Sequence, residues 1–198
     1  VGRHNGHQRT RVGGTENRAE LVVDEGRDLA SAVQRAAQEH GVRVHALEAS
    51  IENLRASIEE YRALFRPQQL DVIHERRQTA IDAMRAFAEF EPRLAGSLVF
   101  GDGPLDRVRL MLSAETPEQV LLHLNDQHIP WHEGEVNLQF AGNQRATRPA
   151  FRFMAGDVTI ELVVLKPADR SNPPREPIGG AQLRLLDVDQ VTALIADD

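Results

Sequence analysis

The spacing of apolar residues changes once along this 198-residue chain, close to Pro92. Before Pro92 the apolar residues recur three and four positions apart, as they do on one face of a helix. After Pro92 short apolar segments are separated by glycine- and proline-rich turns, and residues 158–165 carry an aliphatic side chain at every second position, which is typical of a strand. The sequence therefore predicts an α+β fold in which a helical region precedes a sheet.

We expect the chain to be organised in three parts. Residues 1–16 hold three arginines, four glycines and few aliphatic side chains, a composition that predicts a flexible tail. Residues 17–91 are expected to form a helical N-terminal region. Residues 92–198 are expected to form an α+β domain, whose first helix falls within 68–91.

Local signals place the elements of the second part. Strands are expected at 94–100, 108–112, 129–131, 136–140, 151–154 and 158–165. Thr116 and Gln119 have the spacing of a capping box and, with Pro117 between them, predict the start of a helix. Asp187 is expected to cap a final helix over 187–195.

One helix of the N-terminal region carries a narrow apolar stripe. Its members are Leu47, Ile51, Leu54, Ile58, Tyr61 and Phe65. The spacing resembles a short coiled coil, so one interpretation makes residues 47–65 the seam of a homodimer. The alternative, favoured by the short length of the helix, is that the stripe packs against neighbouring helices of the same chain.

Composition and charge exclude several classes of protein. The absence of cysteine excludes a disulfide scaffold, a zinc ribbon and a thiol nucleophile. The net charge of −7 argues against a broad nucleic-acid surface. No apolar run approaches the roughly 20 residues of a membrane span, and the first residues lack an apolar leader, so we expect a cytoplasmic protein with no membrane partner. Histidines at 123, 128 and 132 have no carboxylate at metal-binding spacing and are expected to be surface imidazoles.

The most specific motif lies early in the second part. Gly96 and Ser97 follow an apolar segment, and a spacer of nine residues, 98–106, separates them from the next expected strand. That strand begins with Arg107 and Arg109 at alternate positions, so both side chains should face the same side of the sheet.

This order resembles the nucleotidyltransferase fold shared with DNA polymerase β, and in particular its stand-alone bacterial members with eroded metal-binding aspartates. In that family a Gly-Ser pair precedes an Asp-x-Asp pair on the next strand, and a third carboxylate comes from a later strand. Glu161, inside the segment 158–165, is at the matching position for the third carboxylate. The resemblance implies a mixed sheet flanked by helices and binding of a nucleotide near Gly96 and Ser97.

The chain departs from the family at the two metal-binding positions, where it has Arg107 and Arg109. A guanidinium stays protonated and has no lone pair for a metal ion. Phosphoryl transfer on this fold depends on divalent ions, so the departure predicts a catalytically degenerate protein without a cofactor. We expect such a protein to bind a nucleotide or another polyanion, or to regulate a partner.

Two roles are open for the arginines. In the first, Gly96, Ser97, Arg107 and Arg109 form a phosphate- or nucleotide-binding site. In the second, Glu161 holds one of the arginines in an internal ion pair, and the cleft is structural.

Two alternative functions are also open. The first is an active nucleotidyltransferase that binds Mg²⁺ through the displaced carboxylates Asp102, Asp106 and Glu161. Against it, Asp106 directly precedes Arg107, so on a continuing strand its side chain points to the opposite face. The second alternative is a structural dimerisation module built on residues 47–65.

Overall fold

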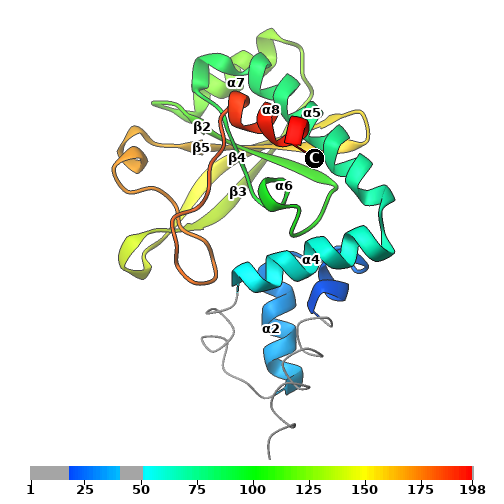
Figure 1. Ribbon diagram of the computed structural model, residues 1–198. Coiled ribbons are helices and arrows are strands. Elements are labelled where there is room, and N and C mark those ends of the chain that lie inside the picture. The colour runs from blue at the N-terminus through cyan, green and yellow to red at the C-terminus, as the bar shows by residue number, and fades with distance from the viewer. Residues whose placement is uncertain (1–17, 41–50, 198) are drawn as a thin grey trace, which may run out of the picture.

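The computed structural model describes residues 18–40 and 51–197, and its centre is a five-stranded mixed sheet (Figure 1). The strands are β1 (Arg93–Ala95), β2 (Arg107–Ser113), β3 (His132–Gln139), β4 (Arg145–Ala155) and β5 (Val158–Leu165). Their order in the sheet is β1-β2-β5-β4-β3, with β2 and β5 parallel and the other neighbours antiparallel. The expected α+β class with a mixed sheet is therefore confirmed.

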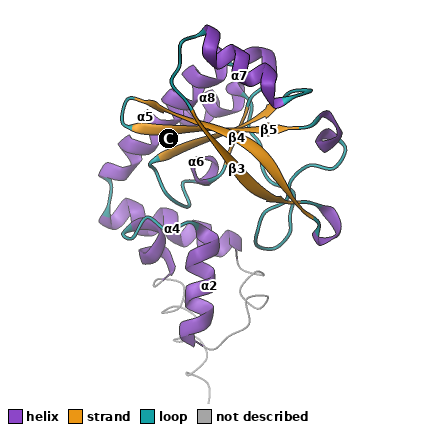
Figure 2. Cartoon of the chain, turned by 180° about the vertical axis from the view of Figure 1, so that it is seen from behind, coloured by secondary structure: helices purple, strands orange, loops and turns teal. Residues whose placement is uncertain are grey.

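Three helices cover one face of the sheet: α5 (Gln68–Ala86), α7 (Pro117–Asp126) and α8 (Val188–Asp197) (Figure 2). The strands turn alternate aliphatic and aromatic side chains toward these helices. The main core includes Ile81, Met84, Val108, Leu110, Leu124, Phe151, Ile160, Leu162 and Val191. Because α5 packs on this core, it belongs structurally with the sheet. It lies within 68–91, where the first helix of the α+β part is expected.

The opposite face of the sheet is covered over only part of its area. A second apolar cluster there includes Met111, Leu138, Phe140, Ala150 and Val163, with Leu183 and Leu185 of the segment 171–187 packed against it. Further along the same face the strands carry charged side chains instead. This charged part holds Arg107, Arg109 and Glu161, which the sequence analysis named.

The N-terminal helices lie at the end of the molecule away from α7 and α8 (Figures 1 and 2). They are a short helix at 18–23, α2 (Leu29–His40) and α4 (Ile51–Phe65). Leu54 and Ile58 of α4 pack against the other two helices and are 3% and 1% exposed. The middle of the predicted dimer stripe is thus covered by its own chain, as the alternative interpretation expected. Leu47 and the predicted tail at 1–16 lie outside the described residues.

Most of the local signals are confirmed. The capping box of Thr116 and Gln119 starts α7, and Asp187 accepts a hydrogen bond from the backbone N–H of Gln190 at the start of α8. The strand over 158–165 has the expected bounds. None of the helices within the described ranges combines the length and apolar character that a bilayer span requires.

Two strand predictions are wrong. The segment expected as one strand over 94–100 divides into β1 and the short helix α6 (Ser97–Phe100). Gly96 has a φ of +81° and a ψ of −153°, a conformation that turns the chain out of the strand. Residues 129–131 make no ladder, and β3 begins only at His132.

Candidate anion-binding site

The register of the three central strands brings charged residues together on the partly uncovered face. Arg109 of β2 is the direct partner of Glu161 of β5, and Glu161 is the direct partner of Arg152 of β4. Direct partners point to the same side of a sheet, and Arg107 lies two positions before Arg109 on that side. Three arginines from two strands therefore surround one glutamate.

Glu161 is wholly buried beneath these arginines, with 0% of its surface exposed. Its Oε2 accepts a hydrogen bond from Nε of Arg109 at 2.5 Å, and its Oε1 accepts one from Nε of Arg152 at 2.8 Å. Nη1 of Arg107 lies 3.6 Å from Oε1, which is an ion-pair distance. Both carboxylate oxygens are thus in use.

These contacts set the ionisation of Glu161. Burial by itself raises the pKa of the carboxyl, but the charge of Arg109 and the hydrogen bonds from Arg152 and Arg109 outweigh burial, with a further contribution from Arg107. The pKa of Glu161 is therefore lowered from its ordinary value. The glutamate is a carboxylate at neutral pH and cancels only one of the three positive charges.

The arginines keep their outer ends in contact with solvent. The side chains of Arg107, Arg109 and Arg152 are 45%, 32% and 36% exposed. Arg109 and Arg152 each bind Glu161 through Nε. Within the described ranges, Nη1 and Nη2 of these two side chains have no hydrogen-bond partner. The carboxylate of Glu161 therefore forms the floor of the site. Arg107, Arg109 and Arg152 form the rim, which has a surplus of two positive charges over the floor.

Gly96 lies beside this rim, whereas the hydroxyl of Ser97 does not serve it. Ala95 pairs with Arg109 across β1 and β2, and a Cβ added at Gly96 would lie 3.9 Å from Cβ of Arg109. The Oγ of Ser97 donates a hydrogen bond to the carbonyl of Pro104 at 2.6 Å and so holds the loop that follows α6. Gly96 therefore lies beside Arg109, whereas the Ser97 hydroxyl is engaged by the backbone of Pro104.

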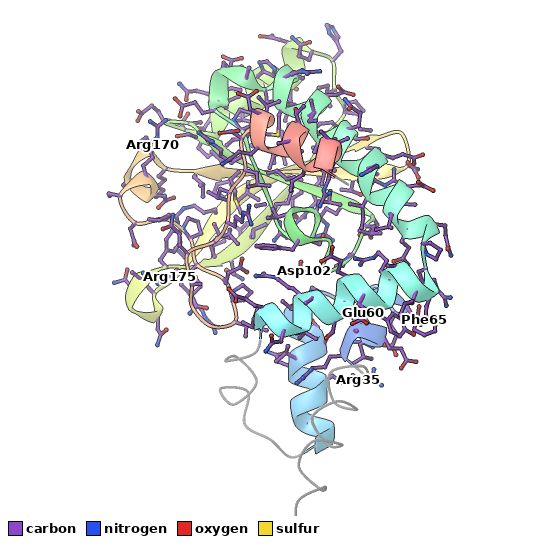
Figure 3. The ribbon with its side chains drawn as sticks, viewed as in Figure 1. Arg35, Glu60, Phe65, Asp102, Arg170 and Arg175 are labelled. Atoms are coloured by element: carbon purple, nitrogen blue, oxygen red, sulfur yellow. The ribbon has the colours of Figure 1, made fainter. Side chains whose placement is uncertain are left out.

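The displaced carboxylates are engaged elsewhere. Asp102, between α6 and α4 (Figure 3), accepts a hydrogen bond from Nε of Arg55 at 2.7 Å. Burial raises the pKa of Asp102, although the hydrogen bond and charge of Arg55 act in the opposite direction. Asp106 is exposed, and its backbone carbonyl accepts the N–H of Thr159. Among the described residues no group of three carboxylate or histidine side chains is placed to hold a metal ion.

Arg152 is the site residue that the sequence analysis missed. A signal for it exists in the chain, because Phe151 and Phe153 on either side are core residues. Alternation along a strand then sends Arg152 to the opposite face, which is the face of Glu161. Its meeting with Glu161 depends on the pairing of β4 with β5 across the two-residue turn Gly156-Asp157, a hairpin signal that the sequence analysis did not use.

The predicted surface histidines differ among themselves. His128 and His132 are exposed. His123 is only 16% exposed, and its Nδ1 lies 2.5 Å from Oε1 of Glu89, while its Nε2 lies 3.0 Å from the carbonyl oxygen of Ala86. For His123 the prediction of a surface imidazole is wrong, because α7 packs this ring against the end of α5.

Protein-family models, curated proteins and solved structures give no match to this chain. The resemblance to nucleotidyltransferases therefore stays a prediction. It depends on the Gly96-Ser97 pair, the nine-residue spacer to β2 and the position of Glu161.

Proposed function

We propose that this protein is a nucleotidyltransferase-like, catalytically degenerate protein that binds a phosphate-bearing anion without a metal ion. The rim of Arg107, Arg109 and Arg152 is the binding site. The observation that carries the proposal is that three guanidinium groups surround one fully buried carboxylate, Glu161, and leave two positive charges uncancelled.

A purely structural role accounts for only part of this arrangement. A buried carboxylate needs a charged partner, and one arginine supplies it. The second and third arginines repel each other and the first, which costs free energy in the unliganded protein. An anion at the rim offsets this repulsion, and the planar fork of arginine matches phosphate oxygens with paired hydrogen bonds.

The same charges disfavour magnesium. A Mg²⁺ ion is held by carboxylate oxygens, phosphate oxygens and waters in near-octahedral geometry. Both oxygens of Glu161 are occupied by Nε groups, and the surplus positive charge repels a second cation. Binding of the anion is therefore expected in the absence of any divalent ion.

Calorimetric titration of the full chain with ATP, once in excess EDTA and once with Mg²⁺, tests the proposal. We expect binding in EDTA, weakened about tenfold in Arg107→Ala because one charge-assisted contact is lost. Arg145→Ala removes an exposed arginine from the far end of β4 and is the matched control, expected to bind as the unchanged protein does.

Two results would contradict the proposal. Binding that requires Mg²⁺ would favour the displaced-carboxylate enzyme, with Asp102, Asp106 and Glu161 as the next residues to change. No binding of ATP in either buffer would leave the arginines with a structural role alone.

A further inference from the structure

The two inner arginines are held in one orientation by the floor of the site. Nε of Arg109 and Nε of Arg152 bind different oxygens of the same carboxylate, so Glu161 fixes both guanidinium planes. Within the described residues no hydrogen bond uses the Nη groups of Arg109 and Arg152, so these groups are available as donors. Both side chains are partly ordered before a ligand arrives, so less side-chain ordering is needed on binding.

Arg152 has a second constraint, which comes from the edge strand. A Cβ added at Gly134 of β3 would lie 2.9 Å from Cζ of Arg152 and closer still to its Nη1. Gly134 is not among the glycines with a positive φ, so its backbone conformation does not require glycine. The close approach of the guanidinium does explain a glycine there, because Arg152 lies against the bare backbone of β3.

The charge of the site sets the kind of anion that it fits. The rim has a surplus of two positive charges, supplied by Arg107, Arg109 and Arg152 over Glu161. A phosphate monoester carries close to two negative charges above its second pKa of about 6 and has three free oxygens. A phosphodiester carries one charge and offers two free oxygens, so it leaves part of the rim unsatisfied.

We infer that the rim is specific for the phosphate group of a phosphate monoester. In this inference Gly134 is the positioning residue that keeps Arg152 in place to bind that phosphate. The inference rests on the proposed function and names its ligand class. Arg109 and Arg152 donate from their Nη edges to the phosphate oxygens, and Arg107, the most exposed of the three, closes the rim by charge.

The ligand class is tested with 5′-AMP and 3′,5′-cyclic AMP, which share a base and differ in the phosphate. Both are titrated into the full chain in EDTA at pH 7.5, with the arginine Nε–H signals followed by NMR. We expect 5′-AMP to bind about tenfold more tightly, because its additional oxygen and charge complete one more charge-assisted contact. The Nε–H signals of Arg109 and Arg152 should move with its addition.

Equal affinity for the two nucleotides, or tighter binding of cyclic AMP, would overturn the monoester preference and leave the proposed function standing. Failure of 5′-AMP, cyclic AMP and ATP alike to bind would overturn the proposed function itself. The two failures are therefore distinguishable in one set of titrations.

The role of Gly134 is tested with Gly134→Ala, which displaces only the flexible end of Arg152 and should leave the fold intact. We expect it to weaken 5′-AMP binding about as much as Arg152→Ala does, and the double variant to show no further loss. The Nε–H signal of Arg152 should change in Gly134→Ala, and that of Arg109 should not. Unchanged 5′-AMP affinity in Gly134→Ala, or fully additive losses in the double variant, would overturn this role.

Discussion

Glu161 is the residue on which the charged face depends. It has no exposed surface and is the common partner of Arg107, Arg109 and Arg152. The arginines keep their charge at any relevant pH, so this cluster is balanced only while Glu161 is ionised. Removal of the carboxylate leaves guanidinium groups that repel one another without a counter-charge.

We expect Glu161→Gln to lower the free energy of unfolding by about 2–4 kcal/mol. This is less than the full cost of breaking a buried pair, because the side chains of Arg107, Arg109 and Arg152 are 45%, 32% and 36% exposed. Urea denaturation measures the change, and Glu135→Gln on the exposed side of β3 is the control. A variant as stable as the unchanged protein would show that the arginines do not need this charge.

At the scale of elements, Gly96 separates β1 from α6 and sets the position of the loop beside Arg109. Its φ and ψ of +81° and −153° lie in a region that is essentially confined to glycine. Gly156, in the turn between β4 and β5, has a φ of +65°, and a Cβ would meet no atom within 4 Å there. An added Cβ would therefore fit at both positions, and only the backbone conformations of Gly96 and Gly156 distinguish the two sites.

Gly96→Ala should consequently be the more damaging of the two alanine substitutions. We expect a loss of about 2–3 kcal/mol at Gly96 and about 1 kcal/mol at Gly156, from the backbone conformations alone. Chemical denaturation of both variants under the same conditions gives the comparison. Equal losses would mean that the loop relaxes around Gly96.

The elements differ in how far their sequences determine them. The sequence predicts the strand over 158–165 with its observed bounds, because alternation over eight residues does not suit a helix. Leu98, Val99 and Phe100 form an apolar run that suits a strand and a helix equally, and the backbone at Gly96 decides for the helix. The sequence predicts, as one of two roles, an ion pair of Glu161 with one of the two arginines, and the structure shows Arg109 bonded to it with Arg107 nearby. Arg152 is missed because the sequence analysis does not use the hairpin turn at Gly156-Asp157, which pairs β4 with β5 and brings Arg152 beside Glu161.

At the scale of the whole molecule, Arg55 of α4 connects the N-terminal helices to two loops of the α+β part. Its guanidinium binds Asp102 at 2.7 Å, lies 3.7 Å from Glu176 and stacks on the ring of Phe100 at 3.6 Å from the centroid. Two carboxylates thus share one arginine in a largely buried contact. Burial raises the pKa of Glu176, and the charge of Asp102 raises it further, while the charge of Arg55 lowers it.

The sign of this shift predicts a pH dependence. Because the pKa of Glu176 is raised in the fold, its contribution to stability is complete below the unfolded value of about 4.3 and is lost as the pH rises through the folded pKa. Glu176→Gln cannot ionise, so we expect it to melt at a higher temperature than the unchanged protein at pH 7. The difference should vanish below pH of about 4. A lower melting temperature at pH 7 would show that the attraction to Arg55 outweighs burial.

The strand order also has a consequence for how the molecule is assembled. β5 is the last strand to be synthesised, yet it occupies the middle of the sheet, between β2 and β4. β4 and β5 are joined by the two-residue turn Gly156-Asp157, so their pairing is local, whereas Arg109 of β2 and Glu161 of β5 are 52 residues apart in the sequence. Long-range pairing of this kind is slow. Arg152 therefore meets its counter-charge within one hairpin, while Arg107 and Arg109 reach Glu161 only when β2 pairs with β5. We expect that one pairing to complete the sheet and the anion site together.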